Sequence, residues 1–172
     1  MEALQSIDDT MYNFFLELGR EKALLENTLL IVASDHGFWG HNYSHTHEGL
    51  LERRLPLLLM RAPENLSKMY PQLSEYIQSN SHRITSHHDI YQTLIHIAHL
   101  ASGRTERPKK VLGSSEQDNE YSLLEPIPVG RTCEDARIPA PICACNLPLP
   151  DGTQSRVPKV QIPPEMIHNT FE

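Results

Sequence analysis

Residues 28–48 read TLLIVASDHGFWGHNYSHTHE, and this stretch decides how the rest of the chain is interpreted. A β-branched, apolar run over residues 28–33 stops abruptly at Ser34-Asp35-His36-Gly37. Such a run, followed at once by polar residues, is typical of a buried strand in an open α/β sheet, where functional sites lie beyond the carboxyl ends of strands. Gly37 lets the chain turn sharply without a Cβ clash. The pattern predicts a functional site on the loop after this strand.

The residue types on that loop favour metal chemistry. Asp35 supplies an oxygen ligand and His36 an imidazole nitrogen, and three further histidines follow at His41, His45 and His47. The alternative is that Asp35 only forms a turn beside an incidental histidine, because Asp is common where strands end. The HExxH spacing of zinc proteases is absent. We therefore predict half of a metal-assisted hydrolase site.

The segment before the strand has helical periodicity. Its apolar residues recur every three or four positions, which predicts an amphipathic helix over about residues 2–25. Gly19 weakens this helix in the middle or ends its first part. Phe14 and Phe15 are interpreted as core residues, because large aromatic side chains are normally buried. A helix followed closely by a strand belongs to a layered α/β fold.

Three later segments also have the pattern of regular elements. They are a strand over residues 55–60 and helices over residues 72–79 and 87–101. Pro71 occupies the first turn of the second helix, and Ser86 and Asp89 have capping-box spacing at the start of the third. Gly103 closes that helix. From Ser102 onward proline and charged residues are frequent and periodicity is lost, so we divide the chain into residues 1–103 and an irregular tail over residues 104–172.

Composition excludes some classes of partner. The chain has 172 residues and a formal net charge of -7, which argues against a nucleic-acid or anionic-membrane surface. We expect no transmembrane segment and no targeting signal within the chain, which opens directly into the amphipathic pattern. Ten histidines are many for this length and favour metal or acid–base chemistry.

The cysteines are an odd set in the tail. Cys143 and Cys145 are too close in sequence to pair comfortably, so we expect Cys133 to bond one of them. The remaining thiol then needs a partner outside the chain. A zinc site is the alternative, although the spacing is not that of a zinc finger.

Four blocks of sequence carry a family resemblance. TLLIVASDHG at residues 28–37 resembles the SDHG block of the alkaline phosphatase and sulfatase superfamily. HEGLLERRLP at residues 47–56, NSHRIT with DIYQTL within residues 80–94, and RTCEDA with CAC within residues 131–145 are similar to blocks of a sulfatase-like animal family long catalogued as a domain of unknown function. The four blocks occur in order.

The resemblance implies a partial three-layer α/β/α sandwich of the alkaline phosphatase type. It makes Asp35 and His36 metal ligands, with His47 as a further ligand or substrate contact. The cofactor would be a divalent metal, with Zn²⁺ or Mn²⁺ favoured over Ca²⁺ because Ca²⁺ prefers all-oxygen sites. The substrate would be a phosphate or sulfate ester. The parent protein would occupy the secretory pathway lumen or the extracellular space, where disulfides persist.

The resemblance also implies that part of the site is missing. In this superfamily an early carboxylate and the nucleophile lie far upstream of the Asp-His pair. Ser6 and Thr10 are candidate hydroxyls in name only, because mid-helix positions without a glycine-bearing turn do not present a nucleophile. We therefore expect a carboxyl-terminal fragment of a catalytic domain, with no catalytic residue in this chain and little turnover. The alternative is a non-catalytic truncated product that serves as a binding or structural module.

Other charged and titratable residues have two interpretations. Glu52 and Arg54 either orient an ester oxyanion or form an ion pair that fixes the loop. His41 and His45 are expected to be solvated loop residues. His87 and His88 lie at a helix start with no assigned role, and Asp89 is interpreted as a helix cap. His96 and His99 lie three residues apart, and we expect both on a helix surface.

Overall fold

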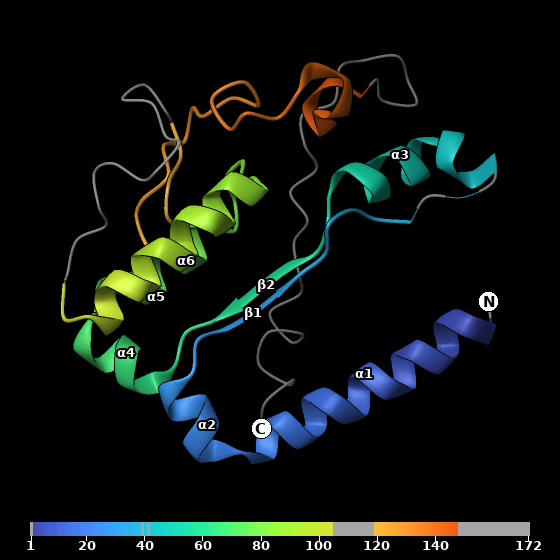
Figure 1. Cartoon of the computed structure of the whole chain (residues 1–172). Coiled ribbons are helices and arrows are strands. Elements are labelled where there is room, and N and C mark those ends of the chain that lie inside the picture. The colour runs from blue at the N-terminus through green and yellow to red at the C-terminus, as the bar shows by residue number, and fades with distance from the viewer. Residues whose placement is uncertain (1, 39, 41, 105–118, 148–172) are drawn as a thin grey trace.

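The computed structural model describes residues 2–38, 40, 42–104 and 119–147, and shows a mixture of helices with a small sheet (Figure 1). The side chains of residues 2–6 are not described. The helices are α1 Glu2–Arg20, α2 Lys22–Asn27, α3 His47–Arg54, α4 Glu64–Met69, α5 Pro71–Asn80 and α6 His87–Ala101. The strands are β1 Leu30–Ala33 and β2 Leu58–Arg61, and short 3-10 turns occur at η1 Asn42–His45, η2 Ala140–Ile142 and η3 Ala144–Asn146.

The predicted strands are both present, but they form an antiparallel pair. Leu30 lies opposite Arg61, and Ala33 lies opposite Leu58. The expectation of a buried strand is wrong for the described residues, because β1 is only half-buried and Ala33 is exposed. These residues form a two-stranded sheet whose faces are not fully covered. The mixed α/β class is confirmed, and the three-layer sandwich stays a prediction.

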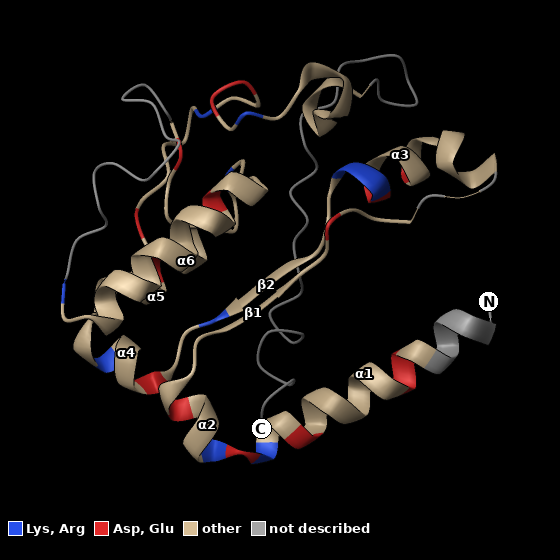
Figure 2. Cartoon of the chain, viewed as in Figure 1, with Lys and Arg blue, Asp and Glu red and all other residues tan. Residues whose placement is uncertain are grey.

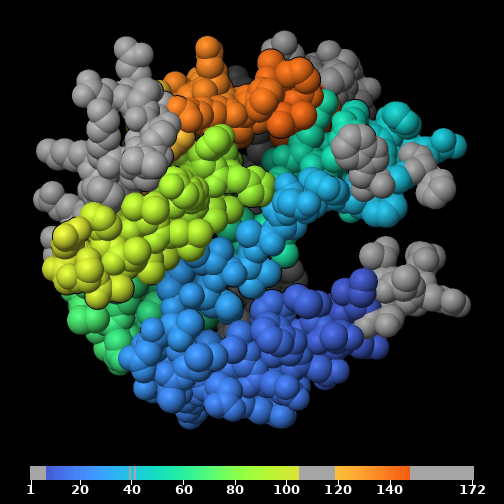
Figure 3. All heavy atoms as spheres, viewed as in Figure 1, coloured from blue at the N-terminus to red at the C-terminus, as the bar shows by residue number. Residues whose placement is uncertain are grey.

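The first helical segment divides in two. Helix α1 ends at Arg20 and α2 begins at Lys22, so the chain breaks two residues after Gly19, as its low helix propensity predicts. The interpretation of Phe14 as a core residue is wrong, because 52% of it is exposed. Figure 3 shows open space between the N-terminal part of α1 and the segment that includes α3. The exposed large apolar side chains of α1 include Ile7, Met11, Phe14 and Leu16.

The two later helices are confirmed closely. Helix α5 begins at Pro71, where the missing N–H of proline costs no helical hydrogen bond. Helix α6 begins after Ser86, whose backbone N–H donates to Asp89 Oδ2 at 2.8 Å. That bond is the carboxylate half of the predicted capping box. Gly103 has a φ of +79°, which is the left-handed conformation that commonly ends a helix.

The tail has few regular elements, as predicted, and it supplies most of the buried apolar side chains. The described part over residues 119–147 lies against α5 and α6 in Figure 1. Its buried apolar residues are Leu123, Leu124, Ile127, Ala136, Cys143, Ala144 and Leu147. The division into residues 1–103 and 104–172 stays a prediction, and residues 105–118 and 148–172 lie outside the described part.

Side chains of α5 and α6 replace the hydrogen bonds that regular structure would give the tail. Asn80 Nδ2 donates to the carbonyls of Leu123 at 3.0 Å and Glu125 at 2.7 Å, and Asn80 Oδ1 accepts the Ile127 N–H at 3.0 Å. The Leu123 N–H donates to Thr93 Oγ1 at 2.8 Å. Buried backbone groups must be paired, so these two side chains allow an irregular segment to be buried.

Over the described residues, no helix is both long enough and apolar enough to cross a bilayer. The described charged residues are spread along the helices and the tail (Figure 2), and the basic segment at the end of α3 is the one that bears on the sites below.

Candidate metal-binding loop and cysteine cluster

Ser34 holds the carboxyl end of β1 in place. Its N–H donates to the Leu57 carbonyl at 2.9 Å, and its hydroxyl accepts the Leu57 N–H at 2.8 Å. Its own carbonyl lies 3.0 Å from His87 Nε2, the ring nitrogen that therefore donates. The backbone immediately before Asp35 is thus tied both to the segment that enters β2 and to the start of α6.

His87 is a residue that sequence reasoning missed. The sequence predicts no role for this residue, because no local pattern connects residue 87 with residue 34. The structure shows that this side chain joins two segments 53 residues apart. Its position in the first turn of α6, next to the Asp89 cap, is the only sequence feature that could have indicated such a link.

Asp35 and His36 lie side by side after Ser34. The His36 N–H donates to Asp35 Oδ1 at 2.9 Å, and His36 Nε2 lies 3.4 Å from Asp35 Oδ2. His36 Nδ1 lies 2.7 Å from the Gly37 carbonyl, which can only accept, so Nδ1 carries the proton. In the neutral imidazole, Nε2 then has a lone pair that faces the carboxylate oxygen. Both side chains are exposed, with 55% of His36 and 85% of Asp35 accessible.

That pair fits one edge of a metal coordination sphere. An imidazole lone pair and a carboxylate oxygen 3.4 Å apart repel each other unless a proton or a cation lies between them. The bond from Nδ1 to a backbone carbonyl is the usual way in which a protein orients a metal-binding histidine. Two donors do not complete a site, and protein metal sites normally have three or four protein ligands.

Gly37 has a different role from the predicted one. Its φ is not in the left-handed region, so the turn itself does not require glycine. A Cβ at this position would instead collide with the backbone carbonyl of Glu52, on α3. The loop that carries Asp35 and His36 therefore packs directly against the backbone of α3, and a larger residue would force the two apart.

His47 is the first residue of α3, which Thr46 caps by accepting the Gly49 N–H at 3.1 Å. His47 is half-buried, but the structure does not bring it into one ligand group with Asp35 and His36. His45 is exposed, as expected of a solvated residue, and His41 lies outside the described residues. The roles of Asp35, His36 and His47 as metal ligands therefore stay predictions.

The placement of His96 on a helix surface is wrong. It is only 4% exposed, and its Nδ1 lies 3.0 Å from Ser122 Oγ in the buried tail. The reason is that the tail covers this face of α6. His99 is half-buried, and His88 lies 3.6 Å from the carboxylate of Glu120.

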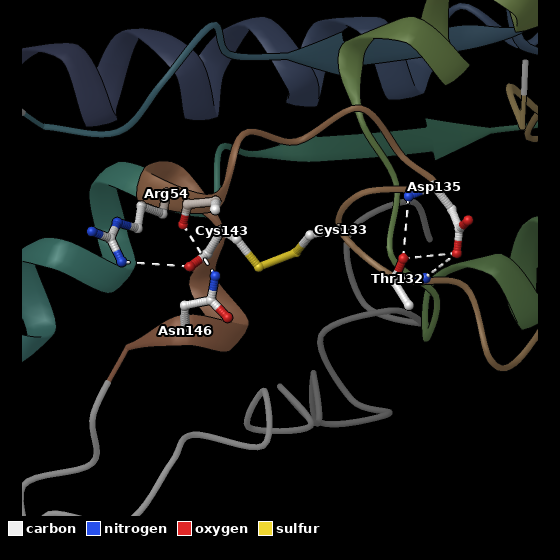
Figure 4. Close-up of a disulfide and its surroundings, with 7 residues drawn as sticks. Arg54, Thr132, Cys133, Asp135, Cys143 and Asn146 are labelled. Carbon is white, nitrogen blue, oxygen red and sulfur yellow. Dashed lines mark hydrogen bonds between the residues drawn. A yellow bond between two sulfur atoms is a disulfide. The ribbon is translucent and has the colours of Figure 1, made fainter.

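Glu52 and Arg54 contact separate partners. Tyr43 donates its hydroxyl proton to Glu52 Oε2 at 2.9 Å, and this hydrogen bond raises the pKa of Tyr43. Arg54 Nη1 reaches the Cys143 carbonyl at 3.5 Å, the long limit of a hydrogen bond, so it joins α3 to the tail (Figure 4). Burial lowers the pKa of Arg54, and the neighbouring charge of Arg53 lowers it further. Both contacts fix the structure around the loop.

The cysteines form the second group of candidate ligands. Cys133 and Cys143 make a disulfide, which confirms that Cys133 bonds one of the other two (Figure 4). Cys145 is a free thiol. The three Sγ atoms lie within 4.8 Å of one another. Among the described residues, these cysteines are the one group of at least three His, Cys, Asp or Glu side chains close enough to share a metal ion.

A tight turn from Thr132 to Asp135 contains Cys133. The Thr132 N–H and hydroxyl both donate to Asp135 Oδ2, at 2.9 and 2.8 Å. These bonds to the charged form hold the pKa of the Asp135 carboxyl below its usual range, the backbone N–H having the larger effect. The turn is thus fully formed at neutral pH, and its hydrogen bonds weaken when Asp135 is protonated.

Comparison with known proteins identifies the family. A family model described as "Protein of unknown function (DUF229)" matches residues 1–162. The chain belongs to this family. DUF229 proteins are sulfatase-like, in agreement with the resemblance seen in the ordered blocks of sequence. No curated protein and no solved structure matches this DUF229 chain.

Proposed function

We propose that this DUF229 chain is the carboxyl-terminal part of a metal-dependent hydrolase or transferase domain for phosphate or sulfate esters. The observation that carries the proposal is the Asp35–His36 pair. Its two donor atoms lie 3.4 Å apart at the end of a strand, and the bond to the Gly37 carbonyl leaves Nε2 as the donor nitrogen. This is the arrangement that a divalent cation would complete.

Asp35 and His36 would hold the ion, and a divalent ion bound there would polarise the ester and lower the pKa of a hydroxyl nucleophile. A mixed oxygen and nitrogen donor set favours Zn²⁺ or Mn²⁺ over Ca²⁺. Ser34, held by Leu57 and His87, would fix the backbone that carries both ligands. His47, at the start of α3, is proposed as a further ligand or substrate contact that engages when the site is complete.

We further propose that the nucleophile and the first acidic ligand come from a segment that completes a three-layer sandwich. Two features support this. The apolar face of α1 is exposed at Ile7, Met11 and Phe14, and β2 exposes Leu59 on its two-stranded sheet. Thr10 is exposed on α1 in mid-helix, and the side chain of Ser6 lies outside the described part. The Cys133–Cys143 disulfide fits a secretory or extracellular parent protein.

Calorimetric titration of the full chain with Mn²⁺ and Zn²⁺ tests the ligand assignment. The disulfide is kept oxidised so that the cysteines do not compete. We expect weak binding of one ion, lost in Asp35→Ala and in His36→Ala because each removes one of two donors. His82→Ala is the matched control, since His82 is exposed and outside the loop. Equal affinity in the two loop variants and the control would contradict the assignment.

Hydrolysis of aryl phosphate and aryl sulfate esters tests whether the site is incomplete. We expect no turnover above background for this chain with Mn²⁺ or Zn²⁺, and turnover once a segment that supplies the missing carboxylate and hydroxyl is added. Turnover by the chain alone, abolished in Asp35→Ala, would contradict the partial-domain proposal while supporting the ligands. Metal binding by the chain, with no turnover even after such a segment is added, would favour the alternative of a non-catalytic binding module.

A further inference from the structure

We propose that Cys133, Cys143 and Cys145 form a second metal site, which binds one Zn²⁺ when the Cys133–Cys143 disulfide is reduced. The site is separate from Asp35 and His36, and it does not depend on the proposed function. The disulfide and the metal both require the sulfurs of Cys133 and Cys143, so only one of them can form at a time. The redox state of this pair therefore controls metal binding.

The positions of the sulfurs carry the proposal. All three Sγ atoms lie within 4.8 Å of one another. Thiolates that share a tetrahedral zinc ion, with Zn–S bonds of about 2.3 Å, are about 3.8 Å apart. Once the disulfide opens, small side-chain rotations bring the sulfurs to that spacing. The backbone therefore already places three ligands around one point, which leaves a fourth position for water or an exogenous ligand.

The backbone around the cluster is held without the disulfide. The Ile138 N–H donates to the Cys133 carbonyl at 2.8 Å, and the Cys143 N–H donates to the Pro139 carbonyl at 3.1 Å. After Cys143, the Asn146 N–H donates to the Cys143 carbonyl at 3.2 Å. These turns hold both ends of the cysteine segment when the sulfur–sulfur bond is broken. Cys143 is buried at 2% exposure, whereas Cys133 and Cys145 are half-buried, so an ion can enter from solvent.

Arg54 supplies a complementary charge. Zinc with three thiolates carries a net charge of about -1, which is costly to bury without a nearby cation. Arg54 Nη1 lies 3.5 Å from the Cys143 carbonyl, and its buried Nε has no hydrogen-bond acceptor within the described part of the chain. Within that described part, no carboxylate forms an ion pair with Arg54. Arg54 is half-buried and its guanidinium reaches the backbone of one of the three ligands, so its positive charge would complement an anionic metal–thiolate group nearby.

The chemistry balances in two steps. A dithiol or phosphine reductant supplies two electrons, and with two protons the disulfide becomes two thiols. Zn²⁺ then replaces the protons of the three thiols and releases three H⁺, because the thiolate is the ligand. In the oxidised chain only the thiol of Cys145 remains, and one thiolate is a weak site. Soft sulfur ligands select Zn²⁺ over Mn²⁺ or Ca²⁺, which separates this site from the Asp35–His36 pair.

Titration of the full chain with Co²⁺ and then Zn²⁺ tests the site. The protein carries Asp35→Ala and His36→Ala, so that binding at the loop cannot contribute. In the phosphine-reduced chain we expect one equivalent of Co²⁺ with near-ultraviolet thiolate-to-cobalt charge-transfer absorption, displaced by one equivalent of Zn²⁺. The oxidised chain should show neither. Reduced protein without this absorption, or oxidised protein with the same affinity, would overturn the proposal.

Three variants sharpen the test. Cys145→Ser keeps the disulfide, so its oxidised form reports whether the fold is intact, and its reduced form should bind Zn²⁺ more than about ten-fold more weakly because a hydroxyl is a poor zinc ligand. Arg54→Gln should weaken Zn²⁺ binding by about ten-fold, as loss of an outer-shell partner does, whereas Arg53→Gln on the same helix should change it little. Unchanged affinity in reduced Cys145→Ser would overturn the three-cysteine assignment.

Discussion

Arg131 makes the buried ion pair that joins the tail to α6. Its guanidinium makes a bidentate pair with Asp89, at 2.7 and 2.9 Å, and both side chains are almost completely buried. Nη1 and Nη2 also donate to the carbonyls of Ile84 at 3.0 Å and Asn119 at 2.6 Å, whereas the buried Nε has no hydrogen-bond acceptor among the described residues. The group also lies 5.0 Å from the ring centroid of Tyr121. A buried charge needs this degree of pairing, since desolvation would otherwise exceed the Coulombic gain.

We expect Arg131→Met to lower the free energy of unfolding by about 3–5 kcal/mol, because it leaves the Asp89 carboxylate buried without its counter-charge. Lys68→Met is the matched control: the Lys68–Glu64 pair is exposed, at 3.4 Å, and its loss should cost less than about 1 kcal/mol. Urea unfolding of both variants measures the difference. Addition of Asp89→Leu to Arg131→Met should recover part of the loss. Equal losses of unfolding free energy in Arg131→Met and Lys68→Met would contradict a stabilising role for the buried pair.

The elements differ in how their apolar faces are covered. Helix α1 is more strongly amphipathic than the other long helices that the structure describes, yet Ile7 and Phe14 are more than half exposed. The irregular segment over residues 119–147 has no such pattern, yet it buries Leu124 to 1% exposure. Amphipathic periodicity therefore indicates that a helix can bury a face, and packing partners determine whether it does.

We expect Phe14→Ala to change the free energy of unfolding by less than about 1 kcal/mol, since about half of the side chain is already in water and its ring contact is with adjacent Phe15. Leu124→Ala should cost about 2–5 kcal/mol, because it removes a fully buried side chain and leaves a cavity. Thermal and urea unfolding compare the two. A larger loss for Phe14→Ala would mean that α1 is buried against a partner in solution.

The whole molecule depends on contacts between segments far apart in sequence. Asn80 and Thr93 satisfy the tail backbone, Arg131 and Asp89 join the tail to α6, and Arg54 joins α3 to Cys143. His87 then links α6 to the end of β1, beside Asp35. The candidate loop is therefore supported indirectly by the tail, through α6.

We expect a chain that ends at Gly103 to lose the cooperative unfolding transition, because it lacks most of the buried apolar side chains and leaves Asp89 unpaired. A chain that ends at Leu147 is the control, since it keeps every contact described above. Far-ultraviolet circular dichroism during urea unfolding measures both. A cooperative transition at the same midpoint in the shorter chain would instead support residues 1–103 as an independent domain.

Local pattern predicted much of this chain. The strands at β1 and β2, the start of α5 at Pro71, the bounds of α6 and the pairing of Cys133 with one neighbouring cysteine follow from periodicity, caps and spacing within about ten residues. The Asp35–His36 pair was found in the same way, because an apolar run that ends in ligands is a local signal. Their identity as metal ligands remains a prediction.

Long-range packing decided the rest. The antiparallel pairing of β1 with β2, the burial of His96, the exposure of Phe14 and the link from His87 to Ser34 each depend on which segments meet in space. Asp89 illustrates both levels. Its capping of Ser86 could be predicted three residues away, whereas its pairing with Arg131, 42 residues away, could not. Burial and charge pairing are properties of neighbours in three dimensions, and spacing along a chain encodes only the nearest of them.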